Sequence, residues 1–377
     1  MGVAVLGVGF SGAFPTSTGL SYRELIKRAA EMAYQDAGIE PEEVDGAVSV
    51  EEDFISGYSI ADEYVPDQLG MVRKPVYTVT GDFLQGIASA VMQIETGQFK
   101  TVVVEAYSKA SNVLQKDEVL HFAFDPVFGR LGVSPHYLAG IEMQRFLDES
   151  LHSVIDVGEV VTRNRARAIA NPLAPYGGRL SLEDVLYGRP VATPVTESMI
   201  ARHADGAVVV VLAADETARE RANGRPLVRL TGTGWGSATS IVERRDLALS
   251  EGTLIAKELA FKEAGIEDAA SEIDLFYLSD HYAHRQLVHM DAFGLSDEDL
   301  PAINPDGGAL GMGDLFEATS GVRMFDAVRQ LRGEAGAHQM AGANRALVHG
   351  WRGLPTDTCA VVILESGGPR GLNGRDA

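Results

Sequence analysis

Cysteine is nearly missing from this sequence, since Cys359 is the only one among 377 residues. The chain therefore cannot build a disulfide framework or a cysteine-rich zinc site by itself. Basic residues are also scarce: 32 lysines and arginines stand against 53 aspartates and glutamates, which gives a net charge of −21. We expect no nucleic-acid partner and no anionic membrane surface as a partner, because both require a basic footprint.

Long apolar runs and a targeting pattern are missing as well. No stretch reaches the roughly 18 apolar residues that cross a bilayer, and the opening MGVAVLGVGFSG lacks the basic start of a secretory signal. We therefore expect a cytoplasmic protein. A hydrophobic content of 45% and a charged content of 23% are close to the globular norm and favour a folded chain with a sizeable core.

The first fifty residues predict an alternation of strand and helix. An apolar run begins at residue 3 and leads into a glycine-rich loop, the segment 21–39 carries apolar side chains at helical spacing with Gly38 as its stop, and 44–50 is a second apolar run. The segment GVGFSG is no dinucleotide-binding fingerprint, because its spacing is wrong and a loop rather than a helix follows it.

An internal repeat is the most informative feature of the chain. EMAYQDAGIEPEEVDGAVSVEED recurs as ELAFKEAGIEDAASEIDLFYLSD, so that Ile39 corresponds to Ile266 at an offset of 227 residues. YTVTGDFLQG and TVVVEAYS are echoed in the same order by PAINPDGGAL and CAVVILES. We therefore predict an α/β fold of two duplicated halves, residues 1–222 and 223–377, with an inserted loop excursion at about 112–200 over the cleft between them.

A helix is expected to begin at Phe83 in VTGDFLQGIASAVMQIETG. The N-terminus of a helix carries partial positive charge, which favours a thiolate or another anion at that point. A phenylalanine offers no reactive atom. The sequence thus presents the place for a nucleophile without the nucleophile.

Three motifs and the repeat resemble one known family over nearly the whole chain. ADGAVVVVLA, NPDGGALGMGDLFEATSG and QLRGEAGAHQMAGANRALVHG are similar to the thiolase superfamily, in its sterol-carrier-protein-type branch. The resemblance implies a duplicated, five-layered αβαβα thiolase fold and a coenzyme A thioester as substrate, with no permanently bound cofactor and no metal. It also implies a homodimer, with the strand TVVVEAYS at the interface.

The catalytic groups of that family are largely replaced here. Its nucleophilic cysteine, in a motif of the form Asn-x-Cys-x-x-Gly, falls on Phe83, and its Gly-His-Pro histidine falls on Asp314. The family's asparagine or histidine in the motif that ends in phenylalanine falls on Ser279, whereas a late loop histidine matches His349 in VHGWRG. Because a phenyl ring cannot carry an acyl group, acyl transfer through an acyl-enzyme is excluded.

Two functions from different classes remain open. One is retro-aldol cleavage of an acyl-CoA thioester, which needs a base for a β-hydroxyl and an oxyanion hole for the enolate. The lipid-transfer-protein-type aldolases of the family resemble this case: they lack the nucleophile, use tyrosine-type acid–base groups and act with a small zinc-ribbon/OB-fold partner protein. The other function is a non-catalytic acyl-CoA-binding or scaffold subunit.

The candidate proton carriers are Tyr282, Asp314 and His349, followed by His281. An unperturbed tyrosine needs activation by a neighbour, for which we expect His349 or Asp314. A packing aromatic is the alternative for Tyr282, and a helix cap is the alternative for Asp314. We expect Cys359 to be a small buried strand residue.

The candidate substrate-binding residues lie in the turns that carry these motifs. Their glycines allow backbone N–H groups to approach a thioester oxygen, with tight turns as the alternative. Four arginines of the excursion are candidates for contact with CoA phosphates, with a solvated helix face as the alternative. The substrate-binding set is Asp82, Phe83, His281, Gly307, Gly308 and Gly313, and the arginines are Arg163, Arg165, Arg167 and Arg179.

Overall fold

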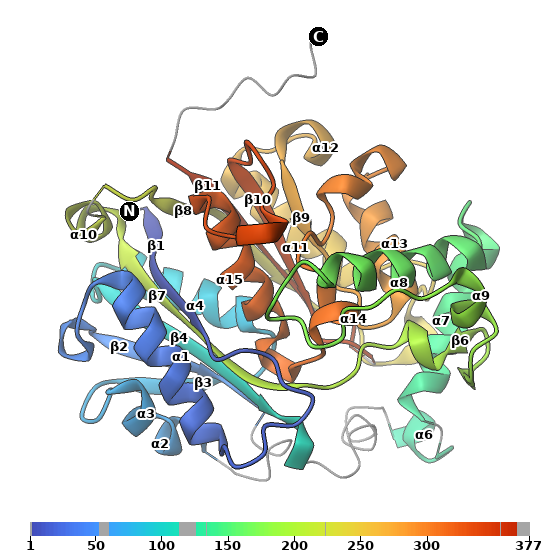
Figure 1. Cartoon of the computed structure of the whole chain (residues 1–377), viewed down its shortest axis with the longest axis horizontal. Coiled ribbons are helices and arrows are strands. Elements are labelled where there is room, and N and C mark those ends of the chain that lie inside the picture. Colours follow the sequence, from blue (N-terminus) through green and yellow to red (C-terminus); the bar gives the residue numbers. More distant parts are fainter. Residues whose placement is uncertain are drawn as a thin grey trace.

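The computed structural model describes residues 2–52, 60–112, 126–132, 134–222, 224–354 and 356–367. Among them, nine strands form one hydrogen-bonded sheet in the order β3-β2-β4-β7-β1-β8-β11-β10-β9 (Figure 1). These strands are β1 (Val3–Phe10), β2 (Gly46–Val50), β3 (Val76–Val79), β4 (Thr101–Lys109), β7 (Asp205–Ala214), β8 (Val228–Gly236), β9 (Leu275–Tyr277), β10 (Arg345–Trp351) and β11 (Cys359–Ser366). A separate pair joins β5 (Pro190–Ala192) to β6 (Val195–Thr196).

The strand order repeats in the two halves and confirms the duplicated fold. From the centre outward, the first half places its first, fifth, fourth, second and third strands side by side. From the centre outward, the second half has β8, β11, β10 and β9, which correspond to the first, fifth, fourth and second strands of the first half. The position of the third strand is taken by a single parallel bridge between Phe276 of β9 and Ile303. The halves meet where β1 pairs with β8 over three residues of each strand.

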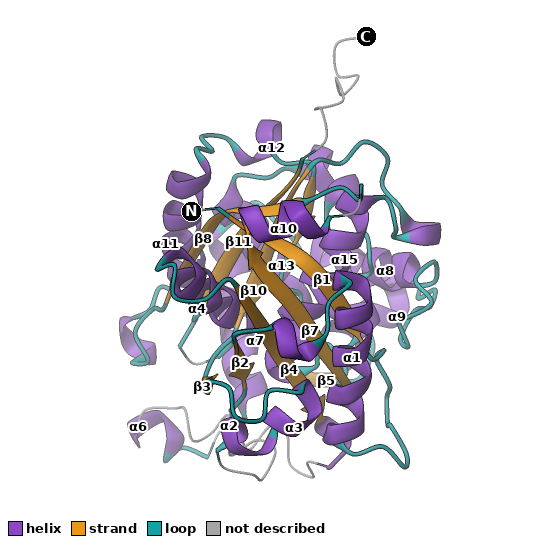
Figure 2. Ribbon diagram, turned by 90° about the vertical axis from the view of Figure 1, so that its left-hand side faces the viewer, coloured by secondary structure: helices purple, strands orange, loops and turns teal. Residues whose placement is uncertain are grey.

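The longer helices lie in three layers around these strands, which gives the expected five-layered arrangement. α4 (Phe83–Glu95) and α15 (Thr319–Arg332) lie between the strands of the two halves. α1 (Tyr22–Ala37) covers the outer face of the first half, and α11 (Glu251–Ala264) with α13 (Ala283–Phe293) covers the outer face of the second. Figure 2 shows α1 and α11 on opposite sides of the strands.

The ends of the outer helices follow from local sequence. Ser21 and Glu24 form a capping box at the start of α1, which satisfies two of the free N–H groups of the first turn. α1 ends at Gly38 and α11 ends at Gly265, with φ angles of 65° and 67°. Both lie in the left-handed region that favours glycine, so the repeat extends to the helix stops.

The inserted excursion carries helices that rest on the second half. α8 (Val154–Ala168) packs against α13 and against α14 (Gly308–Met312), and Figure 1 shows these helices side by side. The other helices of the excursion are α6 (Pro126–Gly129), α7 (Pro135–Glu149) and α9 (Leu182–Leu186). The remaining short α-helices of the described residues are α2 (Ala61–Tyr64), α3 (Pro66–Leu69), α10 (Asp215–Arg221) and α12 (Ala269–Glu272).

The expected place of β4 at a dimer interface is wrong. β4 has β2 on one side and β7 on the other, so its backbone hydrogen bonds are made within the chain. A strand that is paired on both sides has no free edge for a second subunit. The edge strands of the sheet are β3 and β9 instead.

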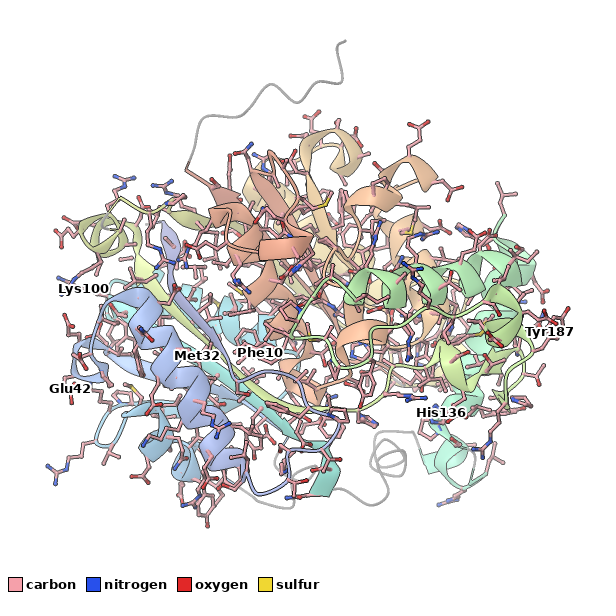
Figure 3. All side chains as sticks on the ribbon, viewed as in Figure 1. Phe10, Met32, Glu42, Lys100, His136 and Tyr187 are labelled. Carbon is pink, nitrogen blue, oxygen red and sulfur yellow. The ribbon has the colours of Figure 1, made fainter. Side chains whose placement is uncertain are left out.

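Apolar and charged side chains separate as the globular composition predicts. Figure 3 shows charged side chains such as Glu42 and Lys100 at the periphery, whereas Phe10 is buried in the central core. None of the helices in the part of the chain that the structure describes is both long and apolar enough to cross a membrane.

Candidate functional site

The two central helices begin beside each other, and one carboxylate joins their first turns. Asp82 is the N-cap of α4, and its Oδ1 accepts a hydrogen bond from the Leu84 N–H at 2.9 Å. The same oxygen accepts the Ser320 hydroxyl of α15 at 2.6 Å. Burial raises the pKa of Asp82. The expected helix start at Phe83 is confirmed, and it brings a buried carboxylate from the first half against the second half.

Phe83 itself is a core residue. Its ring is fully buried and belongs to the apolar cluster between the two sets of strands. α15 passes so close that a Cβ added at Gly321 would lie 2.8 Å from Cγ of Phe83. The ring thus fills the space at the start of α4, and its burial argues against the direct substrate contact that we expected of it.

Asp314 lies between two histidines. Its Oδ2 is 3.3 Å from Nδ1 of His203, and its Oδ1 is 3.6 Å from Nε2 of His281. Oδ1 also accepts hydrogen bonds from the Phe316 N–H and the Thr319 hydroxyl, at 3.0 and 3.2 Å. Burial alone would raise the pKa of Asp314, but the two histidines outweigh it and hold the pKa below its usual range. Asp314 is therefore both a cap of the following turn and the anionic member of a His–Asp–His group.

The segment that supplies His203 holds this group together. Its backbone pairs with both neighbouring turns: the Ala201 N–H donates to the His281 carbonyl at 2.8 Å, and the Asp314 N–H donates to the Arg202 carbonyl at 2.7 Å. Sequence reasoning missed His203. The signal was its position in ARHADGA, immediately before the buried strand β7, where loop residues reach the carboxyl ends of neighbouring strands.

A second ionic group that the sequence did not reveal lies beside Asp314. Arg352 donates to Glu317 Oε1 at 2.5 Å and to a carboxylate oxygen of Glu52. Burial raises the pKa of Glu317 to about 7. Asp314 and Asp82 also interact electrostatically with Arg352, because both carboxylates add to the rise in its pKa that Glu317 and Glu52 cause. We call Asp82, His203, His281, Asp314, Glu317 and Arg352 the polar cluster.

Tyr282 is paired with a residue that we did not expect. Its hydroxyl lies 2.9 Å from Nδ1 of His136, which α7 of the excursion supplies. Its ring also packs edge-on against Trp351, with ring centroids 6.3 Å apart. Among the described residues, the group at its hydroxyl is His136 rather than the expected Asp314 or His349, so the excursion supplies a candidate for the activation of Tyr282.

The expected loop position of His349 is wrong, because His349 lies within β10 and is fully buried. Its Nε2 is 3.1 Å from the Thr253 hydroxyl of α11, and the Ser279 N–H donates to its Nδ1 at 3.4 Å. Successive strand residues face opposite sides, and it is Gly350 that faces Asp82, since a Cβ added there would collide with that carboxylate. Burial also lowers the pKa of His349 well below its ordinary value, so we no longer place it at the reacting atoms.

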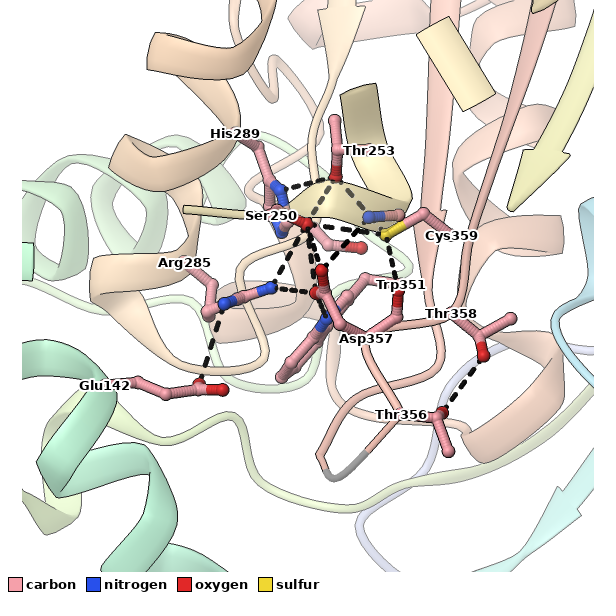
Figure 4. A network of polar contacts seen from close by, with 12 residues as sticks. Glu142, Ser250, Thr253, Arg285, His289, Trp351, Thr356, Asp357, Thr358 and Cys359 are labelled. Atoms are coloured by element: carbon pink, nitrogen blue, oxygen red, sulfur yellow. Dashed lines mark hydrogen bonds and ion pairs between the residues drawn. The ribbon is translucent and has the colours of Figure 1, made fainter. Parts of the chain in front are cut away.

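Figure 4 shows the polar network that surrounds Thr253 on the outer face of the second half. Arg285 is fully buried, donates to Asp357, lies 4.4 Å above the Trp351 ring and faces Glu142 of the excursion at 3.6 Å. Cys359 is buried in β11, as expected, and burial raises the pKa of its thiol. This network ties the excursion to the second half, and its Trp351 ring lies beside the polar cluster, with its centroid 5.9 Å from that of the His281 ring.

The expected oxyanion hole at the glycine turns is not available. The Gly307 N–H donates to the Asn304 carbonyl at 3.1 Å, the Gly308 N–H to Asp306 at 3.0 Å, and the Gly313 N–H to the Ala309 carbonyl at 2.8 Å. All three glycines have positive φ, between 59° and 111°. The tight-turn alternative therefore accounts for them, and these N–H groups are already used within the protein.

Two of the four excursion arginines are also already engaged. Arg167 donates to the carbonyls of Leu300 and Ile303, and Arg163 lies 3.8 Å from Glu159 on the same helix. The Arg165 Nε has no partner among the described residues. Within the same residues, no group of three or more histidine, cysteine, aspartate or glutamate side chains is arranged to hold a metal ion.

Comparison with known proteins agrees with this architecture. Residues 296–366 match the family described as thiolase C-terminal domain-like. An acetyl-CoA acetyltransferase of Methanothermobacter thermautotrophicus is 26% identical over 96% of this chain and 99% of its own length. Sterol carrier protein 2 of Oryctolagus cuniculus is 23% identical over 96% of this chain and 71% of its own. The solved structure of an Ltp2-ChsH2(DUF35) aldolase has a TM-score of 0.81 at 22% identity, and the match covers 97% of this chain and 98% of that chain.

The duplicated halves, the five layers and the helix starts that meet at a polar cluster define a protein of the thiolase fold. In sequence, the chain is similar to members of the thiolase superfamily, among them sterol carrier protein 2. It departs from the family pattern in the phenylalanine at position 83.

Proposed function

We propose that this protein breaks a carbon–carbon bond of an acyl-CoA thioester by a retro-aldol reaction, without an acyl-enzyme. The observation that carries the proposal is the environment of the two ring nitrogens of His281. Its Nε2 faces the Asp314 carboxylate at 3.6 Å, and its buried Nδ1 has no hydrogen-bond partner among the described residues. A histidine held by a carboxylate through one nitrogen presents the other as a proton acceptor, which is the arrangement of a general base.

The chemistry follows from that pair. Nδ1 of His281 takes the proton of the substrate's β-hydroxyl, and the electron pair of the O–H bond forms the carbonyl of the departing ketone or aldehyde. The bond between the α and β carbons breaks, and its electrons form the enolate of the thioester. The α carbon then takes a proton back, so that no proton is gained or lost overall. Asp314 stabilises the imidazolium in the interval.

The enolate also needs stabilisation by a donor. The N–H groups of Gly307, Gly308 and Gly313 are engaged, so we assign the role to Arg352. Its Nη2 donates to Glu52 and Glu317, but its Nε has no hydrogen-bond partner among the described residues. Tyr282, with its hydroxyl against His136, stays our candidate for the second proton-transfer group.

The assembly is part of the proposal. The structural similarity to an Ltp2-ChsH2(DUF35) aldolase supports a second, small protein of the zinc-ribbon/OB-fold type as partner, and we propose that this chain forms a homodimer. An acyl-CoA is the substrate class that the acetyl-CoA acetyltransferase relative supports.

A non-catalytic acyl-CoA-binding or scaffold subunit is the second candidate. The observation in its favour is the loss of two features at once. The ring of Phe83 fills the start of α4, and the turn glycines leave no free N–H group for a thioester oxygen.

The test is an assay of the untagged protein, purified with its natural partners, on a β-hydroxyacyl-CoA that carries a tertiary hydroxyl. We expect a ketone and a shortened acyl-CoA, and a loss of about 100-fold or more in His281→Ala, since one general base contributes roughly 10² to 10⁴ in rate. The matched control is His152→Ala, because His152 forms the same kind of pair with Asp291 at 3.1 Å on the surface. No cleavage by the complete complex, with CoA still bound, would favour the scaffold.

A further inference from the structure

Two arginines near the polar cluster have no counter-ion among the described residues. Arg165 lies on α8 of the excursion, and Arg202 immediately precedes His203. We call Arg165 and Arg202 the arginine pair. Within the part of the chain that the structure describes, neither guanidinium forms an ion pair or a hydrogen bond. By contrast, Arg323 and Arg352 both have carboxylate partners, as is expected in a chain with a net charge of −21.

Both members of the arginine pair lie beside the same aromatic ring. The guanidinium of Arg202 is 5.8 Å from the centre of the Tyr176 ring. Burial raises the pKa of the Tyr176 phenol, and both Arg202 and Arg165 act against this rise, because each cation favours a phenolate nearby. The Gly178 N–H donates to the Arg165 carbonyl at 2.9 Å, which holds the segment that carries Tyr176 against α8.

The same tyrosine joins the arginine pair to the polar cluster. The Tyr176 hydroxyl donates to the His203 carbonyl at 2.6 Å. A Cβ added at Gly313 would lie 3.2 Å from Cε2 of Tyr176 and 3.3 Å from the Arg202 carbonyl oxygen. Both residues therefore contact the turn that precedes Asp314, and the arginine pair lies at the side of the polar cluster that the excursion covers.

A solvated helix face does not account for Arg165. Its side chain is half-buried, and its Nε is fully buried without a hydrogen-bond partner among the described residues. Burial lowers the pKa of Arg165, and the positive charge of Arg202 lowers it further. A buried unsatisfied donor and two neighbouring like charges both cost free energy. An anion between the two guanidinium groups would offset that cost, because their N–H forks match the oxygens of a carboxylate or phosphate.

The position of the arginine pair favours one part of the substrate. In an acyl-CoA, the thioester carbonyl has the acyl chain on one side and the uncharged pantetheine arm on the other, and the phosphates lie beyond that arm. The proposed reaction takes place at the polar cluster, which the arginine pair adjoins. The acyl chain is therefore the part of the substrate that brings an anion to this place.

We infer that the arginine pair binds a carboxylate carried by the acyl chain, so that the substrate is an acyl-CoA with a second acidic group. The inference rests on the acyl-CoA substrate of the proposed function and deepens it, because it names the class of acyl group. It also gives this strongly acidic protein a local positive charge for an anionic substrate.

The test measures binding with acyl-CoAs that have no β-hydroxyl and so cannot undergo retro-aldol cleavage. Isothermal titration calorimetry of the protein purified with its natural partners compares glutaryl-, adipoyl- and pimeloyl-CoA with pentanoyl-, hexanoyl- and heptanoyl-CoA, which match them in carbon number. We expect at least one dicarboxylic ligand to bind about 10-fold or more tightly than its monocarboxylic match. Arg165→Gln/Arg202→Gln should lose this preference. The variant should fold, since neither guanidinium has a partner to lose, and its melting temperature checks this.

The matched control is Arg189→Gln, which removes the same charge from the excursion at a side chain that is 82% exposed and should keep the preference. Equal affinity for the two members of every ligand pair overturns the carboxylate site. A preference that survives in the folded double variant overturns the assigned residues.

Two further outcomes separate this inference from the rest of the proposal. If the double variant weakens both members of a ligand pair alike, and does not weaken their 3′-dephospho derivatives, the arginine pair binds the CoA phosphate and the assignment to the acyl chain is overturned. If none of the acyl-CoAs binds to the wild-type protein, the proposed function itself is overturned. Binding of all six ligands without a preference leaves the proposed function standing and refutes the inference alone.

Discussion

Replacement of Phe83 by cysteine puts the family nucleophile back at the start of α4, and we expect it to produce a less stable protein rather than a thiolase. The ring is fully buried in the central core. Its neighbour Gly321 has no side chain that could move into the space, and the two approach closely, as a Cβ there would lie 2.8 Å from the ring. The new thiol would also have no histidine from β10 beside it, because His349 points to the other face of that strand.

The size of the effect follows from the volume that is lost. Truncation of a buried phenylalanine to alanine destabilises by about 3–5 kcal/mol, and a cysteine keeps one heavy atom beyond Cβ, so we expect about 3 kcal/mol. For a cooperative unit of 377 residues this corresponds to a fall in melting temperature of about 4 °C, from an unfolding entropy of about 2.1 cal/mol/K per residue. Scanning calorimetry measures the fall, and intact mass spectrometry after incubation with acetyl-CoA detects an acyl-enzyme.

The control is Met92→Ala on the same helix, because Met92 is 48% exposed and surface changes are usually within about 0.5 kcal/mol. An unchanged melting temperature in Phe83→Cys would refute the core position of the ring. A covalent acyl adduct on the thiol that this variant introduces would show that the rest of a thiolase site is still assembled, and it would refute our account of His349 and the glycine turns.

Three further predictions concern other parts of the structure. Gly308→Ala should destabilise by at least about 1 kcal/mol in thermal melts, because φ is 59° and a Cβ would collide with Asp280; a stable variant contradicts the turn geometry. Burial raises the pKa of Glu105 to about 8, so the unfolded chain releases this proton at lower pH than the folded chain does. The free energy of unfolding should therefore fall as the pH rises from about 4.5 to 8, as measured by urea melts at each pH. A Glu105→Gln variant whose free energy of unfolding falls with pH as steeply as that of the wild type would refute this cause. Arg285→Met leaves Asp357 buried without its cation and leaves Glu142 with Arg245 alone, and we expect a loss of about 3–5 kcal/mol and faster proteolysis within the excursion; limited digestion at the wild-type rate speaks against that link.

Much of the fold could be predicted from the sequence because the repeat carries strong local signals. The left-handed glycines Gly38 and Gly265, the buried run of β4 and the start of α4 at Asp82 are each determined by a few neighbouring residues. Their order along two copies was enough to predict two duplicated halves, since equivalent elements pack in equivalent ways, whereas the number of layers followed from the resemblance to the thiolase superfamily.

The candidate site was less predictable because side-chain direction depends on strand register. His349 was placed in a loop on account of its glycine neighbour, although RALVHGW alternates as a strand and the alternation turns His349 away from Asp82. His203 and Arg352 lie far apart in the sequence and meet Asp314 only through the pairing of their backbones and carboxylates. A sequence shows no such long-range pairing by itself.

The hydrogen bond between Asp82 and Ser320 makes each half of the chain depend on the other. One carboxylate oxygen caps the first turn of α4 and accepts a hydroxyl from α15, so neither half completes this junction by itself. A fragment that ended near residue 222 would leave this buried oxygen without one of its two donors, which costs free energy. We therefore expect that neither half folds stably when it is produced alone.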